Sequence, residues 1–166
     1  IRSWASILES SYITFTLPPY HANMRKRLTK TPKLYFYDTG LLCHLLRIET
    51  LDQLVAHPLF GAVFENFIVA ETAKRHFGEG NTPELYFYRD DSKREVDLLD
   101  FTCPQCKQAV EVKSSRTYHG KYAKHLNAVC GEIGVEPENR FVVARVDSSY
   151  RVEECKVVSA RDWLMS

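Results

Sequence analysis

Two tripeptides constrain this chain more than any other feature, Glu-Val-Asp at residues 95–97 and Glu-Val-Lys at residues 111–113. Each lies in a run with strand-forming composition, residues 95–101 and residues 108–113. The segment between the runs contains Pro104 and has the polar composition of a turn. The sequence therefore predicts two neighbouring strands joined by a hairpin, both carrying charged side chains.

These charged side chains are expected to meet. Side chains alternate between the two faces of a strand, so Asp97 shares a face with Glu95, and Glu111 shares a face with Lys113. A hard cation such as Mg²⁺ requires oxygen ligands, and a lysine beside it can hold a phosphate oxygen or steer a water molecule. The two tripeptides therefore predict metal-dependent phosphodiester chemistry.

Length and composition are those of a globular domain. The chain has 166 residues, of which 45% are hydrophobic and 26% are charged. The formal net charge is only +1, so nucleic-acid binding must come from local basic patches. No apolar run approaches the roughly 20 residues that span a bilayer, and the N-terminal sequence lacks the features of a signal peptide. We therefore expect a cytoplasmic location and no membrane partner.

The chain has five cysteines, an odd number without the spacing of a disulfide framework. This favours reduced thiols. Cys103 and Cys106 form a Cys-x-x-Cys pair in the predicted turn, which is half of a typical zinc site, but the sequence offers no second pair. Ordinary turn cysteines are the favoured interpretation, and a zinc site is the alternative.

The first part of the chain has the order helix, strand, basic connection, strand. The end of a helix is predicted at residues 2–11 and strands at residues 12–17 and 33–37. The basic residues of the connection are Arg25, Lys26, Arg27 and Lys30, followed by Lys33 at the start of the second strand. This order is typical of the second half of a winged-helix module, whose wing contacts DNA phosphates. A solvated basic loop or a contact between domains explains the same residues equally well.

A long helix is predicted at residues 59–77, ending at Gly78. Its first turns are apolar nearly all round, which indicates burial on several sides. Glu65 lies among these apolar residues, where a carboxylate needs a partner because an unpaired buried charge is costly. We expect Glu65 to be either a third metal ligand or half of a structural ion pair, with Glu71 as the competing ligand.

The remaining pattern predicts an α/β fold with a mixed sheet. Further strands are expected at residues 84–88, 140–146 and 151–158, and further helices at residues 119–133 and 160–164. From the long helix onward, the core order is helix, three strands, helix, strand. We expect a partial winged-helix and linker segment at residues 1–57, followed by the α/β domain at residues 58–166.

This order, with an acid on the helix, Asp on the second strand and Glu-x-Lys on the third, resembles the PD-(D/E)xK restriction-endonuclease-like superfamily. Four stretches further resemble the uncharacterised C-terminal domain that follows an AAA+ ATPase module in many bacterial and archaeal proteins: TPKLYFYDTGLL, FGAVFENFIVAE, LYFYRDDSKREVDLL and VEVKSS. The resemblance covers about residues 12–146. It implies a restriction-endonuclease-like αβββαβ core, and an ATPase module upstream of Ile1.

The resemblance also implies site residues. The superfamily's helix acid corresponds to Glu65, its central Asp to Asp97, its strand acid to Glu111 and its lysine to Lys113. The three acids would bind Mg²⁺ or Mn²⁺, and Lys113 would stabilise the transferring phosphate or assist the attacking water. A further superfamily lysine corresponds loosely to Lys121 or Lys124.

Two functions are therefore expected as alternatives. The first is a metal-dependent nuclease that cleaves DNA and holds neighbouring phosphates through Arg89 and Arg94, although the adjacent Asp90 and Asp91 make plain surface charge the competing explanation. The second is a non-catalytic DNA-binding or protein-interaction module coupled to the ATPase, with the acids retained as a charge network. DNA and the ATPase module are the expected partners, and self-association into a homo-oligomer stays open.

Overall fold

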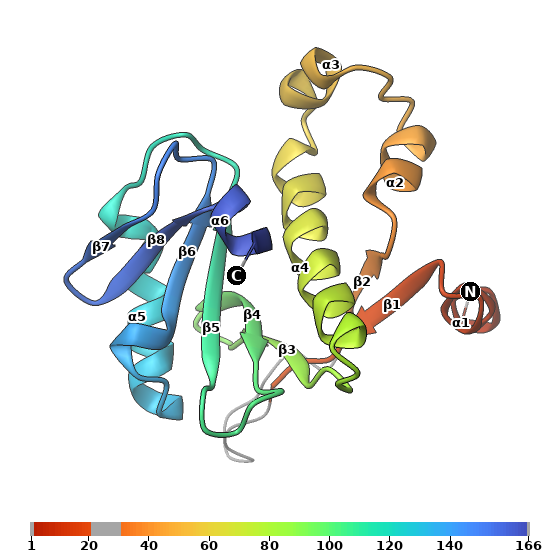
Figure 1. The fold of residues 1–166 in the computed structure, drawn as a ribbon. Helices are drawn as coiled ribbons and strands as arrows, with labels where there is room; N and C mark the ends of the chain where they lie inside the picture. Colours follow the sequence, from red (N-terminus) through yellow and green to blue (C-terminus); the bar gives the residue numbers. More distant parts are fainter. Residues whose placement is uncertain (1, 21–30, 166) are drawn as a thin grey trace.

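The N-terminal part of the protein is a helix followed by a pair of antiparallel strands. The computed structural model describes residues 2–20 and 31–165 (Figure 1). Helix α1 (Arg2–Ser10) packs against strand β1 (Thr14–Leu17), which pairs with β2 (Lys33–Phe36). Three helices follow, α2 (Thr39–Leu45), α3 (Leu51–Ala56) and the long α4 (Phe60–Gly78). The basic connection at residues 21–30 lies outside the described residues.

The rest of the chain is built on a mixed sheet of six strands in the order β3-β4-β5-β6-β8-β7. The strands are β3 (Leu85–Arg89), β4 (Glu95–Asp100), β5 (Gln108–Lys113), β6 (Arg140–Ala144), β7 (Tyr150–Val152) and β8 (Cys155–Ser159). The pairs β3–β4 and β4–β5 are antiparallel, whereas β5–β6 and β6–β8 are parallel. The predicted α/β class with a mixed sheet is confirmed, and the order helix, three strands, helix, strand is present.

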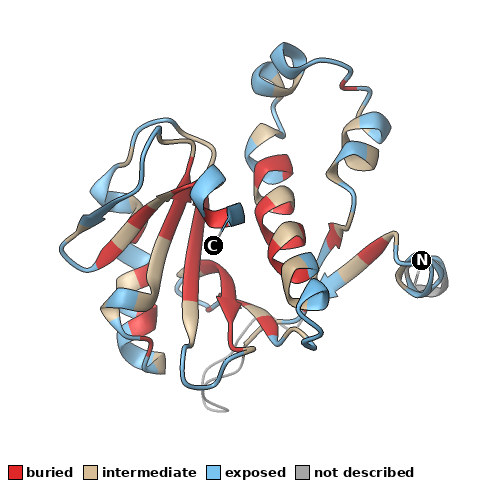
Figure 2. Ribbon diagram, in the orientation of Figure 1, coloured by how far each residue is buried: buried red, intermediate tan, exposed pale blue. Residues whose placement is uncertain are grey.

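Helices cover both faces of this sheet, and a hydrophobic cluster lies on each side. Helices α4 and α6 (Ala160–Met165) pack on one face, where Ile68 and Trp163 belong to the same hydrophobic cluster as the strand residues Leu98 and Val110. Helix α5 (Ala123–Ile133) packs on the other face. Figure 2 shows the buried residues concentrated in the central strands and along α4. No helix in residues 2–20 and 31–165 is both long and apolar enough to cross a membrane.

The N-terminal strands share the core of the sheet. Leu17 of β1 and Tyr35 of β2 are 1% and 4% exposed, and both belong to the cluster beneath α4. The division at residue 57 stays a prediction, and the segments on its two sides are packed together. This packing brings β2 close to the strands that carry the predicted site.

The structure corrects three of the predicted elements. The single strand predicted at residues 151–158 is the hairpin β7–β8, because the exposed pair Glu153-Glu154 reverses the chain between Val152 and Cys155. The helix predicted at residues 119–133 begins as a 3₁₀ turn, η1 (Gly120–Tyr122), before α5. Gly78 lies within α4, and the left-handed conformation after the helix is adopted two residues later by Gly80, with φ of 79°.

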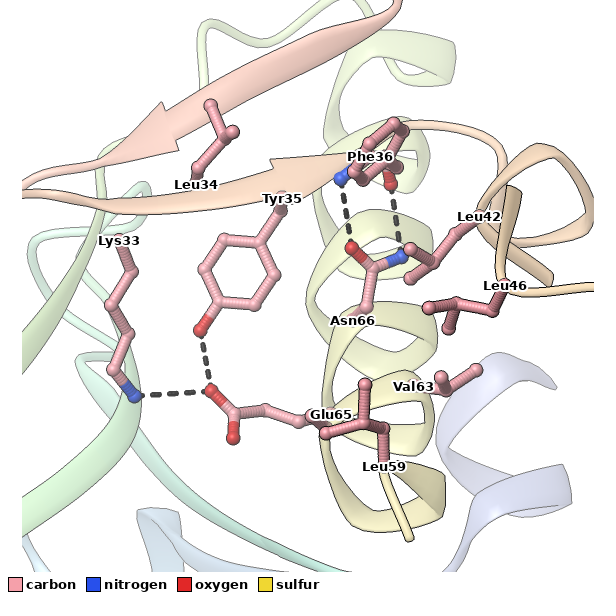
Figure 3. A pocket seen from close by; sticks show the side chains of 11 residues that line it. Lys33, Leu34, Tyr35, Phe36, Leu42, Leu46, Leu59, Val63, Glu65 and Asn66 are labelled. Atoms are coloured by element: carbon pink, nitrogen blue, oxygen red, sulfur yellow. Dashed lines mark hydrogen bonds and ion pairs between the residues drawn. The ribbon is translucent and has the colours of Figure 1, made fainter. Parts of the chain in front are cut away.

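A buried asparagine joins β2 to α4. The Asn66 side chain, 4% exposed, accepts a hydrogen bond from the Phe36 amide at 2.8 Å and donates to the Phe36 carbonyl at 3.0 Å (Figure 3). It also donates to the Thr39 hydroxyl at 3.0 Å. The end of β2 is therefore fixed on the long helix.

We expect Asn66→Ala to destabilise the protein by about 2–4 kcal/mol, because it leaves the Phe36 amide and carbonyl without their partner in a poorly solvated position. Urea unfolding followed by circular dichroism measures this loss. Asn81→Ala is the matched control, since Asn81 is exposed and makes one side-chain hydrogen bond to Glu79. Equal free energies of unfolding for the two variants would contradict the role given to Asn66.

Candidate metal centre

Asp97 lies where strand β4 departs from regular pairing. The register between β3 and β4 shifts between Tyr86 and Tyr88, which makes a β-bulge in β4 at Asp97 and Leu98. The paired register of β4 with β5 begins only at Leu98. Asp97 Oδ2 instead accepts a hydrogen bond from the Val112 amide of β5 at 2.8 Å. The bulge therefore aims the Asp97 carboxylate at the gap between the two strands.

This position of Asp97 allows it to meet Glu111 and Lys113. Val110 and Val112 pack beneath α4, so by alternation Glu111 and Lys113 begin on the opposite face of β5. Lys113 Nζ lies 2.6 Å from Glu111 Oε1 and 3.8 Å from Asp97 Oδ2. The predicted convergence is present, but it depends on the bulge as well as on alternation.

Glu65 reaches the same cluster through a lysine of β2. Lys33 Nζ lies 3.0 Å from Glu65 Oε1, 2.7 Å from Glu95 Oε1 and 3.9 Å from Asp97 Oδ1. Figure 3 shows Lys33 and Tyr35 extending from β2 toward Glu65 on α4, and the Tyr35 hydroxyl donates to the same Glu65 oxygen at 2.5 Å. The four predicted site residues thus lie in one network, and Glu65 is also half of an ion pair.

The sequence does not predict the roles of Lys33, Tyr35 and Glu95. Lys33 directly follows the basic connection and is predicted together with its basic residues. The available signal is its spacing from Tyr35, since residues two apart on a strand share a face and Tyr35 is a large side chain with the pattern of a core residue. A lysine on that face points toward the protein interior and needs acidic partners there.

Burial changes the proton affinity of the two central carboxyl groups. Asp97 is 6% exposed and Glu111 is 8% exposed. Burial raises the pKa of Asp97 above the ordinary carboxyl value, and the negative charge of Glu65 raises it further. Burial likewise raises the pKa of Glu111, with the charge of Asp97 as the second cause. Lys113 acts in the opposite direction on both carboxyl groups but does not cancel these effects.

The residues of this cluster fit a hard divalent cation. Glu111 Oε2 is buried and has no hydrogen-bond partner among the described residues, and Asp97 offers a second carboxylate beside it. In residues 2–20 and 31–165, no three His, Cys, Asp or Glu side chains lie close enough together to hold a metal on their own. This arrangement suits Mg²⁺, which commonly binds through one or two carboxylates and keeps several water ligands.

The other predicted ligand candidates lie away from this cluster. Glu71 is paired with Lys74 on the surface of α4 at 2.5 Å. Cys103 and Cys106 are both exposed free thiols on the wall of a cavity of about 500 Å³. The described part of the chain provides no group of three ligands there, and both interpretations of the Cys103 and Cys106 pair stay predictions.

The predicted DNA-contacting residues have different surroundings. Arg94 is held by Asp90 at 2.6 Å and by Glu132 at 2.5 Å, so its guanidinium serves a structural ion-pair network. Arg89 is half exposed and lies 3.8 Å from Glu95 at the border of the cluster. Lys121 and Lys113 lie 5.8 Å and 5.9 Å from the ring centroid of Tyr122, so these two lysines flank one aromatic ring. Arg25, Lys26, Arg27 and Lys30 lie outside the described residues.

The raised pKa values of Asp97 and Glu111 predict a pH-dependent stability. At pH values below about 3 these groups are protonated in the folded and unfolded states alike, so they contribute no difference. As the pH rises above that value, these two groups release their protons first in the unfolded state, and their contribution to the free energy of unfolding falls until the raised pKa values are passed. Urea unfolding in a chelator across this interval tests the expectation. If the free energy of unfolding changes with pH by the same amount in the wild type and in Asp97→Asn, the expectation is contradicted.

Fold and site together define a mixed α/β domain with a buried carboxylate–lysine cluster at a bulged strand. Residues 60–163 match the family described as Domain of unknown function (DUF4143), and residues 1–52 match Domain of unknown function (DUF8612). Because the first match spans more than half of the chain, this protein belongs to the DUF4143 family.

Two curated relatives are similar to this chain. One is an uncharacterised protein of Mycobacterium bovis and the other an uncharacterised protein of Mycobacterium tuberculosis. Each is 33% identical over 97 residues, which cover 58% of this chain and 21% of the relative. The chain thus spans about a fifth of the length of these relatives. No solved structure matches it.

Proposed function

We propose that this domain is a metal-dependent nuclease of the PD-(D/E)xK type that hydrolyses phosphodiester bonds in DNA. The observation that carries the proposal is the meeting of Asp97, Glu111 and Lys113 at the β4 bulge, with one buried Glu111 oxygen left without a hydrogen-bond partner among the described residues. Two carboxylates and an ammonium at one point supply the groups that cation-assisted phosphoryl chemistry requires.

Each residue has a definite part in this chemistry. Asp97 and Glu111 would hold Mg²⁺ or Mn²⁺. Glu65 would act indirectly, because it pairs with Lys33, whose ammonium also lies 3.9 Å from Asp97. The chemistry that a cation bound there would supply is polarisation of a phosphoryl oxygen and easier ionisation of water. Lys113 is one-third exposed, so its ammonium can contact a phosphate from the solvent side and stabilise the charge that develops during cleavage.

The proposed substrate and partners follow from the surrounding charge and from the resemblance. We propose that Lys121, which lies near the same Tyr122 ring as Lys113, and Arg89, which lies 3.8 Å from Glu95, contact neighbouring phosphates. The basic residues at positions 25–30 form a second cluster of positive charge along the sequence, which we propose also binds DNA phosphates. We propose that an AAA+ ATPase module, as in the proteins that this chain resembles, acts together with the domain.

Incubation with labelled DNA tests the proposed activity. The protein is mixed with plasmid and with single-stranded and double-stranded oligonucleotides in Mg²⁺, in Mn²⁺ and in a chelator. We expect cleavage only with a divalent cation, and loss of cleavage in Glu111→Gln, which keeps the side-chain size and removes the charge. Cleavage of equal rate in the chelator or in the variant would contradict the proposal, because it would come from another site or a contaminant.

A non-catalytic module is the second candidate function, and one contact favours it. Lys33 lies within 4 Å of Glu65, Glu95 and Asp97, so much of the acidic cluster has a cationic partner within the protein itself. A charge network of this kind can join the N-terminal strands to the sheet without any metal ion. DNA binding that is unaffected by divalent cations, together with intact DNA in every incubation above, would favour this function.

The basic connection provides a separate prediction about DNA binding. Replacing Arg25, Arg27 and Lys30 by glutamate is expected to weaken DNA binding and to reduce its salt dependence, because each lost phosphate contact lowers the log–log slope by about 0.9. The cleavage rate at saturating DNA should hardly change, because these residues supply binding that is equal in the ground state and the transition state. Salt-titrated binding and single-turnover cleavage measure the two effects. An unchanged slope would assign the connection to a protein contact.

A further inference from the structure

One cation of the acidic cluster comes from the N-terminal part of the chain. Lys33 belongs to the segment that matches DUF8612, whereas Glu65, Glu95 and Asp97 belong to the segment that matches DUF4143. The Lys33 side chain is 24% exposed, and its Nζ lies 2.7 Å and 3.0 Å from the nearest oxygens of Glu95 and Glu65. The charge balance of the site therefore depends on both segments.

The position of Lys33 is fixed by the strand that carries it. Tyr35, two residues further along β2, is 4% exposed and donates to Glu65. The next residue, Phe36, is held by both polar groups of Asn66. The ammonium also lies 5.2 Å from the ring centroid of Phe87 on β3. Lys33 is thus a positioned charge and not a mobile surface lysine.

This charge opposes a cation at the same carboxylates. Lys33 Nζ lies 3.9 Å from Asp97 Oδ1, while Asp97 Oδ2 faces Lys113 and the Val112 amide. A divalent ion bound to Asp97 would be separated from Lys33 by only a few ångströms. Like charges at that separation repel strongly even when solvent screens them. Lys33 therefore has to yield its contact with Asp97 when such an ion binds.

We propose that Lys33 is a tethered counter-cation, which neutralises the cluster when no divalent cation is bound and competes with that cation for Asp97. The proposal rests on the proposed function, because it takes the cluster to be a divalent-cation site. In this role, Lys33 makes the metal affinity of the site depend on how β2 packs against α4. A partner that shifts the N-terminal strands would thereby change the metal affinity of a site that lies in the other segment.

Isothermal titration of the protein with Mg²⁺, and separately with Mn²⁺, tests this role. We expect Lys33→Gln to bind either ion on the order of tenfold more tightly than the wild type, because one positive charge near the ion is removed. Lys33→Arg keeps the charge and is expected to bind like the wild type. Lys74→Gln is the matched control, because it removes a lysine that pairs with a carboxylate elsewhere on the protein, and it should change nothing.

A second measurement does not depend on metal affinity alone. In a chelator, Lys33→Gln should melt at a lower temperature than the wild type, because its carboxylates have lost a counter-charge, and adding Mg²⁺ should raise its melting temperature more than that of the wild type. If Lys33→Gln does not fold, Lys33→Met is measured in its place, since it keeps an aliphatic side chain beside Phe87.

The outcomes separate the two proposals. Tighter binding by Lys33→Gln together with an unchanged Lys33→Arg supports the counter-cation role. If the wild type binds the cation and Lys33→Gln binds it with equal or lower affinity, the counter-cation role is overturned. The proposed nuclease function is then unaffected. Absence of Mg²⁺ and Mn²⁺ binding in both the wild type and Lys33→Gln overturns the metal site itself, and the counter-cation role with it.

Discussion

Asp97→Asn is expected to abolish Mg²⁺ binding while leaving the fold intact. The amide oxygen of asparagine can still accept the hydrogen bond from the Val112 amide, so the contact between β4 and β5 survives. The carboxylate that the cation needs is lost, and with it the repulsion from Glu65. Without divalent cations we therefore expect the variant to be as stable as the wild type or more stable, by on the order of 1 kcal/mol, since burying a charged carboxylate among other acids is unfavourable.

Thermal melts with and without Mg²⁺ measure both parts of this prediction. The wild type should melt at a higher temperature with Mg²⁺, because a ligand that binds only the folded state stabilises it. Asp97→Asn should show no such increase, and the exposed Asp91→Asn should behave like the wild type. A Mg²⁺-induced increase that persists unchanged in Asp97→Asn would place the cation elsewhere.

Lys113→Ala is expected to reduce the cleavage rate on the order of a hundredfold or more while DNA binding stays near normal. The ammonium lies between Asp97 and Glu111, where it can stabilise charge that develops on the phosphate, and removal of one well-placed electrostatic donor costs about this much. DNA affinity depends on many phosphate contacts, so the loss of one lysine changes it little.

Single-turnover cleavage at saturating DNA separates these two effects. Lys121→Ala is the matched control, because Lys121 lies beside the same Tyr122 ring but forms no ion pair with the site acids in the described structure. We expect this control to weaken binding slightly and to keep the rate. Equal losses of rate in the two variants would show that Lys113 acts only through general attraction of DNA.

The sequence predicts the pattern of elements well because each element carries a local signal. The long apolar helix predicted at residues 59–77 is found at Phe60–Gly78, and β5 has the predicted bounds Gln108–Lys113. The failures are also local in origin. The sequence predicts one strand in place of the hairpin β7–β8, because Glu153-Glu154 is not a typical turn pair and the alternation of strand residues continues on both sides of it.

Local sequence patterns predict some of the site residues but not all of them. The spacing of Asp97, Glu111 and Lys113 on adjacent strands is readable from alternation and a hairpin. The bulge that turns Asp97 into the gap between the strands leaves no clear sequence signal. The presence of Lys33 in the site depends on how β2 packs against α4, which is a tertiary contact between residues far apart in the chain.

The two arginines at the end of β3 and just before β4 show why the sequence alone does not reveal which charged residues are paired within the protein. Arg89 and Arg94 look alike in sequence, since both lie beside acidic residues at the ends of adjacent strands. In the structure, Arg94 is enclosed by Asp90 and Glu132, whereas Arg89 is half exposed. Glu132 lies 38 residues away from Arg94 along the chain, so no local pattern could assign the partner.

Anomalous diffraction from crystals soaked in Mn²⁺ tests the central claim most directly. The claim is that the acids at the β4 bulge bind a divalent cation. It predicts one anomalous peak in contact with the carboxylates of Asp97 and Glu111, with the Lys33 ammonium displaced from Asp97. A peak at Cys103 and Cys106 with none at Asp97, or no ordered peak at a Mn²⁺ concentration that supports cleavage, would contradict the account.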